Sequence, residues 1–166
     1  FVKEAADVQI EAIQSLGDPD SAKLFTEEEA AVFADIREHV QFIHLSGLMS
    51  FGAASEMARR FARLDPFEVL IVDLTDVPRI DGSAGLELEE LIQRSATAGC
   101  PVIMIGLRPE VARGLTQLGS LDQIEDALKF SSRLDGLLAA GEVIRTRRLR
   151  YREVTTPSAD IGGEAP

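Results

Sequence analysis

The chain is poor in the residue types that most often carry redox and metal chemistry. Its 166 residues include one cysteine, two histidines, one tyrosine and no tryptophan. Cys100 alone cannot form a disulfide within the chain, which is typical of a protein kept in a reducing, cytosolic compartment. Because Cys100 precedes Pro101 at the start of an apolar run, we expect a small buried side chain there rather than a nucleophile.

Long hydrophobic runs are also missing. No apolar stretch approaches the roughly 20 residues that cross a bilayer, and no basic stretch followed by an apolar one marks a signal peptide. The first residue is Phe1 rather than methionine, so we expect a piece of a longer protein. With 45% hydrophobic and 27% charged residues, the chain is long enough for one domain with a core and additional ends.

Positive charge is scarce except in one segment. The net charge of −11 argues against general nucleic-acid binding, because phosphate is repelled over most of the surface. The exception is RTRRLRYR, residues 145–152, without which the rest of the chain carries −16. Its positive residues are Arg145, Arg147, Arg148, Arg150 and Arg152. Three interpretations stay open: a solvated helix end, a contact with anionic lipid, and a contact with another acidic surface such as a neighbouring subunit.

The stretch RIDGSAG, residues 79–85, comes closest to a catalytic motif but lacks essential parts of one. A nucleophile elbow needs a glycine two residues before its serine, and here Asp81 holds that place before Ser83. His39 and His44 both precede Ser83, whereas the hydrolase order places histidine last. Neither a P-loop nor a dinucleotide fingerprint occurs. We therefore assign no catalytic residue and no cofactor, and expect that the protein is not an enzyme.

A metal site is poorly supported as well. His39 and His44 are five residues apart, so on a strand their side chains would point to opposite faces. Asp73, Asp76 and Asp81 follow one another near the end of an apolar run and would attract a cation if they converged. Acids at such positions more commonly form turns and helix caps. We therefore assign no metal site.

Alternating strand-like and helix-like segments predict an α/β fold. Apolar runs predict strands at 40–50, 67–77 and 101–107, with a short edge strand within 121–130. Helical spacing predicts helices at 1–17, 51–65, 83–99, 108–119 and 131–152. The segment 24–39 has a capping box at Thr26 and Glu29, and its pattern fits either a helix or the approach to the first strand. This order predicts right-handed crossovers and parallel central strands.

Within RIDGSAG the residue types fit a helix start at the carboxyl end of a strand, where open α/β sheets bind ligands. Asp81 is placed to cap the helix by accepting from the N–H of Ser83 or Ala84. Gly82 would allow a tight turn and Gly85 a close approach. Ser83 would be exposed in the first helical turn, where a phosphoryl group adds about −1.5 to −2 charges beside neighbouring acids. The segment Asp81–Gly85 is therefore our candidate regulatory loop.

Two stretches resemble the STAS domain, which anti-sigma-factor antagonists share with the cytoplasmic part of SulP-type anion transporters. They are VLIVDLTDVPRIDGSAGLELEELI (69–92) and GCPVIMIGLRPEVARGLTQLG (99–119). The resemblance implies a central mixed sheet of about four to five strands, parallel at its centre, with helices packed against it. By position, Ser83 matches the serine that is phosphorylated in antagonists. The chain departs from their pattern at Gly82, where serine is common, and at Ala84, where glycine is common.

The transporter branch fits better. FIHLSGLMSFGAASEMARRF (42–61) is similar to the SulP strand, turn and helix, FVKEAADVQI (1–10) to the segment that leaves the last membrane helix, and LFTEEEAAVF (24–33) to a linker. The resemblance implies a linker or helical segment at 1–39 after an absent membrane domain and a STAS domain at 40–152. The composition of residues 153–166 predicts a disordered tail.

The function implied by this resemblance is that of a non-catalytic domain in a bicarbonate or sulfate transporter. Such a domain would lie on the cytoplasmic side of the inner or plasma membrane and would serve dimerisation and the regulation of transport. Its partners would be the membrane domain of the same chain and a second copy. The alternative is a soluble anti-sigma-factor antagonist that is switched by phosphorylation at Ser83.

Overall fold

The computed structural model describes residues 13–15, 24–49, 55–56, 59, 62–63, 66–117 and 128–155. In chain order the elements are β1 (Ile13–Ser15), α2 (Glu27–Ile36), β2 (Val40–Ser46), β3 (Val69–Asp76), α4 (Gly82–Thr97), β4 (Val102–Ile105), α5 (Pro109–Gln117), β5 (Lys129–Phe130) and α6 (Arg133–Thr155). Most of the helices predicted at 1–17 and 51–65, most of the segment 121–130 and the tail beyond 155 lie outside the described residues.

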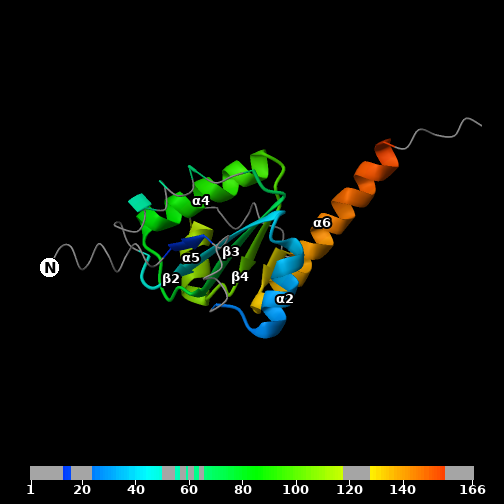
Figure 1. Ribbon diagram of the computed structural model, residues 1–166. Coiled ribbons are helices and arrows are strands. Elements are labelled where there is room, and N and C mark those ends of the chain that lie inside the picture. The colour runs from blue at the N-terminus through cyan, green and yellow to red at the C-terminus, as the bar shows by residue number, and fades with distance from the viewer. Residues whose placement is uncertain are drawn as a thin grey trace, which may run out of the picture.

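The strands form one sheet in the order β1-β2-β3-β4-β5 (Figure 1). β2 to β5 pair in parallel, and β1 pairs antiparallel with β2. The predicted mixed sheet with a parallel centre is confirmed. The helix predicted over 1–17 is wrong at residues 13–15, because these pair with Ile43–Leu45 of β2. Pairing with an open sheet edge prevails there over a local helical pattern.

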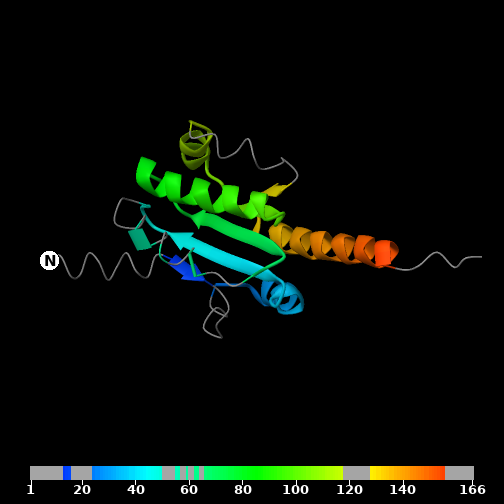
Figure 2. The same ribbon diagram turned by 90° about the horizontal axis from the view of Figure 1, so that it is seen from above.

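Helices cover both faces of the sheet, as Figure 2 shows. β3 supplies apolar side chains to both layers, and residues 69–74 are all 0% exposed. Leu70, Val72 and Leu74 pack in the core beneath α4 and α5. Val69 and Ile71 pack in the core beneath α2 and α6. The continuous apolar run that predicted a central strand buried on two faces is therefore confirmed.

The segment 24–39 forms a helix with the predicted capping box. The Glu29 N–H donates to Thr26 Oγ1 at 3.2 Å, and the Thr26 N–H donates to Glu29 Oε2 at 2.9 Å. Phe25 and Phe33 pack against Phe42 of β2, with ring centroids 5.1 and 5.8 Å from the Phe42 ring. α2 therefore shares the core of the sheet, although the boundary predicted at residue 40 places it in the linker or helical segment 1–39.

α6 is the longest helix in the part of the chain that the structure describes, and it ends at Thr155 rather than at the predicted Arg152. Residues 153–155, which we predicted to be tail, are thus helical. Gly136 in its first half is buried, and a Cβ built there would lie 2.5 Å from both Cγ1 and Cδ1 of Ile105. The glycine that weakens the helical pattern is therefore what allows α6 to approach β4 closely.

Gly136→Ala is expected to destabilise the protein by about 1 to 2 kcal/mol, since the clash with Ile105 costs more than the gain in helix propensity. Gly141→Ala is the matched control on the same helix, because its Cβ would meet Ile36 Cγ2 at an ordinary 3.7 Å. This control is expected to stabilise by up to about 1 kcal/mol. Urea unfolding of both variants measures the difference, and effects of the same sign would contradict the close approach at Ile105.

Candidate functional site

The loop between β3 and α4 contains the predicted regulatory residues. Asp81 is the N-cap of α4, and its Oδ1 accepts a hydrogen bond from the Ala84 N–H at 2.9 Å, so the predicted cap is confirmed. Asp81 and Gly82 are exposed, whereas Ala84 and Gly85 are buried. Ser83 lies in the first turn and is half-buried rather than exposed as predicted. The acid and the serine therefore lie together at the helix start.

Gly82 does not have the role that the sequence suggested. The glycines with positive φ in the described part of the chain are Gly47, Gly99 and Gly106, and Gly82 is not among them. A Cβ on Gly82 would meet no atom within 4 Å. The turn into the helix is made instead by Asp81, whose backbone is extended at φ −87° and ψ 171°. Neither conformation nor packing requires glycine at position 82.

Backbone hydrogen bonds tie this loop to the end of β2. The Gly47 N–H donates to the Asp76 carbonyl at 2.9 Å, and the Met49 N–H donates to the Arg79 carbonyl at 3.2 Å. The Asp81 N–H in turn donates to the Met49 carbonyl at 2.8 Å. The loop is thus held against the carboxyl end of the sheet, the edge at which open α/β folds commonly bind partners.

A buried charged cluster lies near the same end of β3, and reasoning from the sequence missed it. Asp73 is 0% exposed, and its Oδ2 accepts from Arg133 Nε at 2.8 Å and lies 3.0 Å from His44 Nδ1. The other ring nitrogen of His44, Nε2, lies 3.3 Å from the Asp76 carboxylate. Thr75 donates to Asp73 Oδ1 through its N–H at 3.0 Å and through its hydroxyl at 2.5 Å. The buried carboxylate is therefore satisfied at both oxygens.

The surroundings of Asp73 keep it charged. Burial alone would raise the pKa of this carboxyl, because the charged form loses its water. Hydrogen bonds from His44 and Thr75, together with the charge of Arg133, outweigh burial and lower the pKa of Asp73 to about 2. The cluster therefore holds a carboxylate at neutral pH at the junction of β2, β3 and α6.

Arg133 extends the cluster to α2. Its Nη1 lies 3.7 Å from Glu29 Oε2 and donates to the Leu24 carbonyl at 3.2 Å. One guanidinium thus joins the start of α6 to both β3 and α2. The signal that would have located the cluster is the parallel register, which places His44 opposite Asp73. That register is not readable from either strand alone.

The three acids that we considered for a cation do not converge on one point. Asp73 and Asp76 face the two nitrogens of His44, while Asp81 caps α4. In the part of the chain that the structure describes, no three His, Cys, Asp or Glu side chains are grouped so as to hold a metal ion. The turn and cap chemistry expected for Asp81 is confirmed.

The arginines of segment 145–152 lie on the exposed C-terminal part of α6, and two of them turn back toward the sheet. Arg147 donates to the Gly99 carbonyl, and Arg148 Nη2 lies 2.8 Å from His39 Nε2. Arg148 also lies 3.9 Å from the Glu68 carboxylate, to which the ring of His39 is closer at 3.2 Å. These contacts join α6 to the residues that precede β2, β3 and β4.

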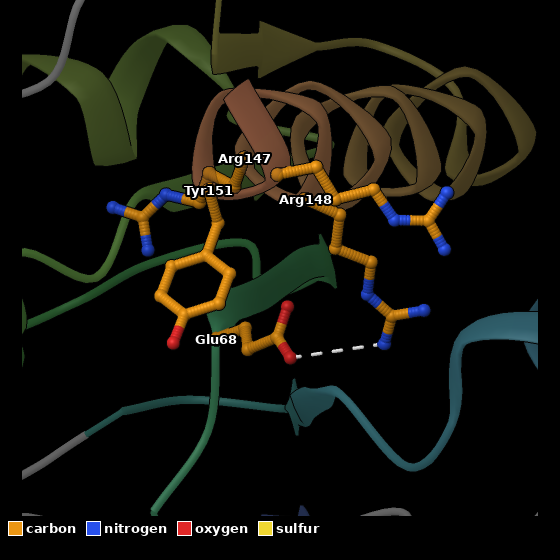
Figure 3. A pocket seen from close by; sticks show the side chains of 5 residues that line it. Glu68, Arg147, Arg148 and Tyr151 are labelled. Carbon is orange, nitrogen blue, oxygen red and sulfur yellow. Dashed lines mark ion pairs between the residues drawn. The ribbon is translucent and has the colours of Figure 1, made fainter. Parts of the chain in front are cut away.

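An open hollow of about 450 Å³ lies beside these contacts and is lined by Glu68, Arg147, Arg148, Tyr151 and Arg152. Figure 3 shows Arg148 and Tyr151 extending from α6 toward Glu68, with a dashed line joining Arg148 to the Glu68 carboxylate, while Arg147 points away to the left. Tyr151 was not among the predicted site residues, and it is 72% exposed. The hollow therefore combines several guanidinium groups, one carboxylate and one exposed aromatic ring.

The two predicted sets of site residues lie at opposite ends of the parallel strands. The loop with Ser83 follows the carboxyl end of β3, whereas Glu68 directly precedes its first residue. The 8 residues of β3 separate these two ends by about 26 Å at the usual rise per residue. They are thus two separate surfaces.

Residues 32–136 match the STAS domain family. The bicarbonate transporter BicA from Synechocystis sp. is 28% identical over 130 residues, which are 78% of this chain and 23% of that protein. BicA from Picosynechococcus sp. is 26% identical over 161 residues, which are 97% of this chain and 28% of that protein. The chain therefore spans only about a quarter of the length of these curated relatives.

Solved structures show the same fold. The STAS domain of a SulP transporter from Vibrio cholerae matches with a TM-score of 0.55 at 22% identity, covering 73% of this chain and 99% of that one. None of the helices that the structure describes is long and apolar enough to cross a membrane. The family match begins in α2, includes the loop Asp81–Gly85 and ends in α6. The chain belongs to the STAS domain family.

Proposed function

We propose that the chain is the non-catalytic cytoplasmic domain of a SulP-type transporter for an inorganic anion, bicarbonate or sulfate, and that it serves dimerisation and the regulation of transport. One observation carries the proposal. The similarity to two bicarbonate transporters covers 78% and 97% of this chain but only 23% and 28% of theirs. A chain with this relation is expected to be one part of a larger transporter, whose membrane domain supplies the path for the anion.

The chemistry of the site supports a role without catalysis. Ser83 would need a base to act as a nucleophile. Both ring nitrogens of His44 face carboxylates, and the carboxylate of Asp81 is engaged in capping α4. These groups stabilise the fold around the loop. The chemistry left to the loop is recognition by a partner or modification by another enzyme.

The position of Ser83 supports the regulatory part of the proposal. A phosphate on the first turn of α4 would meet unpaired backbone N–H groups and the positive end of the helix dipole. It would also stand close to the Asp81 carboxylate, which repels it. A soluble antagonist switched at Ser83 would use the same loop. The two functions differ in whether a membrane domain belongs to the same protein.

Uptake by the complete gene product tests the transport assignment. The protein is produced in bacterial cells that lack their own bicarbonate uptake, and labelled bicarbonate and sulfate are supplied in parallel. We expect uptake of one of the two anions, and a reduced rate when residues 32–155 are deleted from a protein that still inserts into the membrane. A gene without membrane-spanning segments, or an inserted protein that carries neither anion, would contradict the proposal.

Phosphorylation at Ser83 is expected to be detectable in the 166-residue chain. The chain is incubated with ATP and a lysate of the source cells, and intact-mass measurement should show one added phosphate. Ser83→Ala is the matched control and should stay unmodified. An unchanged mass, under conditions that modify a known antagonist, would remove Ser83 as a phosphorylation site and leave the loop as a docking surface only.

A further inference from the structure

The C-terminal part of α6 continues beyond the core, and near its base Arg147 contacts Gly99 while Arg148 contacts His39 and Glu68. Ile144 is its last buried residue, and every residue from 145 to 155 is exposed. We call residues 145–155 the overhang, which is about 16 Å long at the rise of an α-helix. Figures 1 and 2 both show it projecting past the end of the sheet.

The residues of the overhang do not suit a membrane surface. Its exposed apolar side chains are Leu149, Tyr151 and Val154, at 61%, 72% and 85% exposure. At about 100° per residue, Leu149 points away from the side that Tyr151 and Val154 share. The five arginines are spread around the helix in the same way. A helix that lies on a bilayer needs one apolar face opposite one charged face, which the overhang lacks. A helix that is polar all round is typical of a bridge between protein bodies.

The base of the overhang has room and charge for additional carboxylates. The hollow of about 450 Å³ is lined by three arginines, Arg147, Arg148 and Arg152, and by one carboxylate, Glu68. Glu68 is shared between Arg148 and the ring of His39. Without the arginines of 145–152 the rest of the chain carries a net charge of −16, so a second copy of this chain presents mostly acidic surface.

One acidic surface lies on α2, beside the packed half of α6. Figures 1 and 2 both place α2 next to the part of α6 that precedes the overhang. Ile36 of α2 faces Gly141 of α6, and within the same chain Arg148 of the overhang lies 2.8 Å from His39 in the turn that follows α2. The exposed charged side chains of α2 and of the turn that follows it are Glu27, Glu28, Asp35, Arg37 and Glu38, of which the last three lie within two residues of Ile36 in the chain. Four acids against one base leave this surface negative.

We propose that the overhang of one copy docks on the acidic surface of α2 in a second copy, and that the overhang of the second copy docks on α2 of the first. Because α2 and the overhang adjoin on one side of the molecule, a two-fold axis beside them places each overhang on the other copy's α2. The partner's carboxylates then approach the arginines, and Tyr151 and Val154 lose contact with water. This inference rests on the dimerisation role proposed above and specifies the surface that performs it.

Charge reversal in both partners tests the contact. Arg150→Glu with Arg152→Glu reverses two positive charges of the overhang, and Asp35→Arg with Glu38→Arg reverses two negative charges on α2 and the turn that follows it. We expect each double variant alone to dimerise at least about tenfold more weakly than the parent chain, because like charges then face each other. An equimolar mixture of the two is expected to regain the parent's affinity as a heterodimer, since both contacts become complementary again. Sedimentation equilibrium of the 166-residue chain measures the affinities, and circular dichroism confirms folding.

The control reverses the same number of charges elsewhere. Arg94→Glu with Arg113→Glu lies on α4 and α5, both exposed, and should leave dimerisation unchanged. The parent dimer should also weaken between about 50 and about 500 mM salt, as charge contacts do. An overhang reversal that weakens the dimer no more than this control overturns the proposed surface and leaves dimerisation standing.

Two further outcomes also overturn the surface. A parent chain that stays monomeric removes both the surface and the dimerisation role, while the uptake experiment still decides the transport assignment. Binding of the parent chain to phosphatidylglycerol vesicles, lost on overhang reversal in the absence of any dimer, would identify lipid as the occupant. A mixture that fails to regain affinity would show that α2 is not what the overhang meets.

Discussion

Replacing Asp73 with asparagine is expected to lower the free energy of unfolding by about 3 kcal/mol at neutral pH. The exchange keeps the shape of the side chain but removes its charge at a position with 0% exposure. The side chain of Arg133, which is only 14% exposed, would then lose the carboxylate that lies 2.8 Å from its Nε. A mostly buried charge that loses its nearer carboxylate and keeps Glu29 at 3.7 Å costs more than a surface pair gains. Urea unfolding followed by circular dichroism measures the loss.

Asp76→Asn provides the matched control. This carboxylate also faces His44, at 3.3 Å from Nε2, but its side chain is 52% exposed. Water can replace the lost contact, so we expect a change below about 1 kcal/mol. Equal losses in the two variants would mean that burial does not set the cost and would contradict the role of Asp73 as the centre of a buried cluster.

Asp73 also predicts a pH dependence of stability with a definite sign. Its pKa falls from 3.8 to about 2 on folding, so folding favours the carboxylate and the stabilisation is complete above about pH 4. As the pH falls from about 4 to about 2, the folded protein progressively loses about 2 kcal/mol of this stabilisation. The difference in stability between the parent and Asp73→Asn should therefore shrink across this interval. A difference that stays constant down to pH 2 would contradict the lowered pKa.

Features that depend on neighbouring residues could be predicted from the sequence. The capping box at Thr26 and the cap at Asp81 are readable because donor and acceptor lie three residues apart. The central strand β3 is readable because burial on both faces demands an uninterrupted apolar run. The alternation of such strands with helices was sufficient for the α/β class, and the motif around residues 69–92 led to the family that the comparison confirms.

Features that depend on distant residues could not be predicted in this way. Asp73 and Arg133 are 60 residues apart, and the residues around neither of them indicate that the two side chains are in contact. The strand β1 was missed because its pairing with β2 is a tertiary interaction, whereas its local spacing is helical. The arginines of α6 were correctly placed on a helix. Their contacts with Gly99 and Glu68 required knowledge of where that helix leaves the sheet.

Gly106→Ala is expected to cost about 3 kcal/mol or more, for two separate reasons. Gly106 follows β4 with a φ of +68°, a conformation that costs an L-residue about 1 kcal/mol or more. A Cβ there would also lie 2.6 Å from the Cα and 2.8 Å from the N of Thr75, which are backbone atoms that cannot rotate away. Because Thr75 donates two hydrogen bonds to Asp73, the forced shift is transmitted to the buried carboxylate. Urea unfolding measures the total.

Gly99→Ala separates the two causes, because Gly99 needs the same conformation in different surroundings. Its φ is +73°, but a Cβ there would meet nothing within 4 Å. This variant should therefore lose only the conformational part, about 1 kcal/mol. The additional loss of stability at Gly106 then measures how closely the chain after β4 must approach Thr75. If Gly106→Ala weakens the hydrogen bonds from Thr75 to Asp73, this variant should also lose less stability between about pH 4 and pH 2 than the parent chain does. Equal costs at the two glycines would mean that β3 yields to the added methyl group and that the bonds from Thr75 to Asp73 survive the shift.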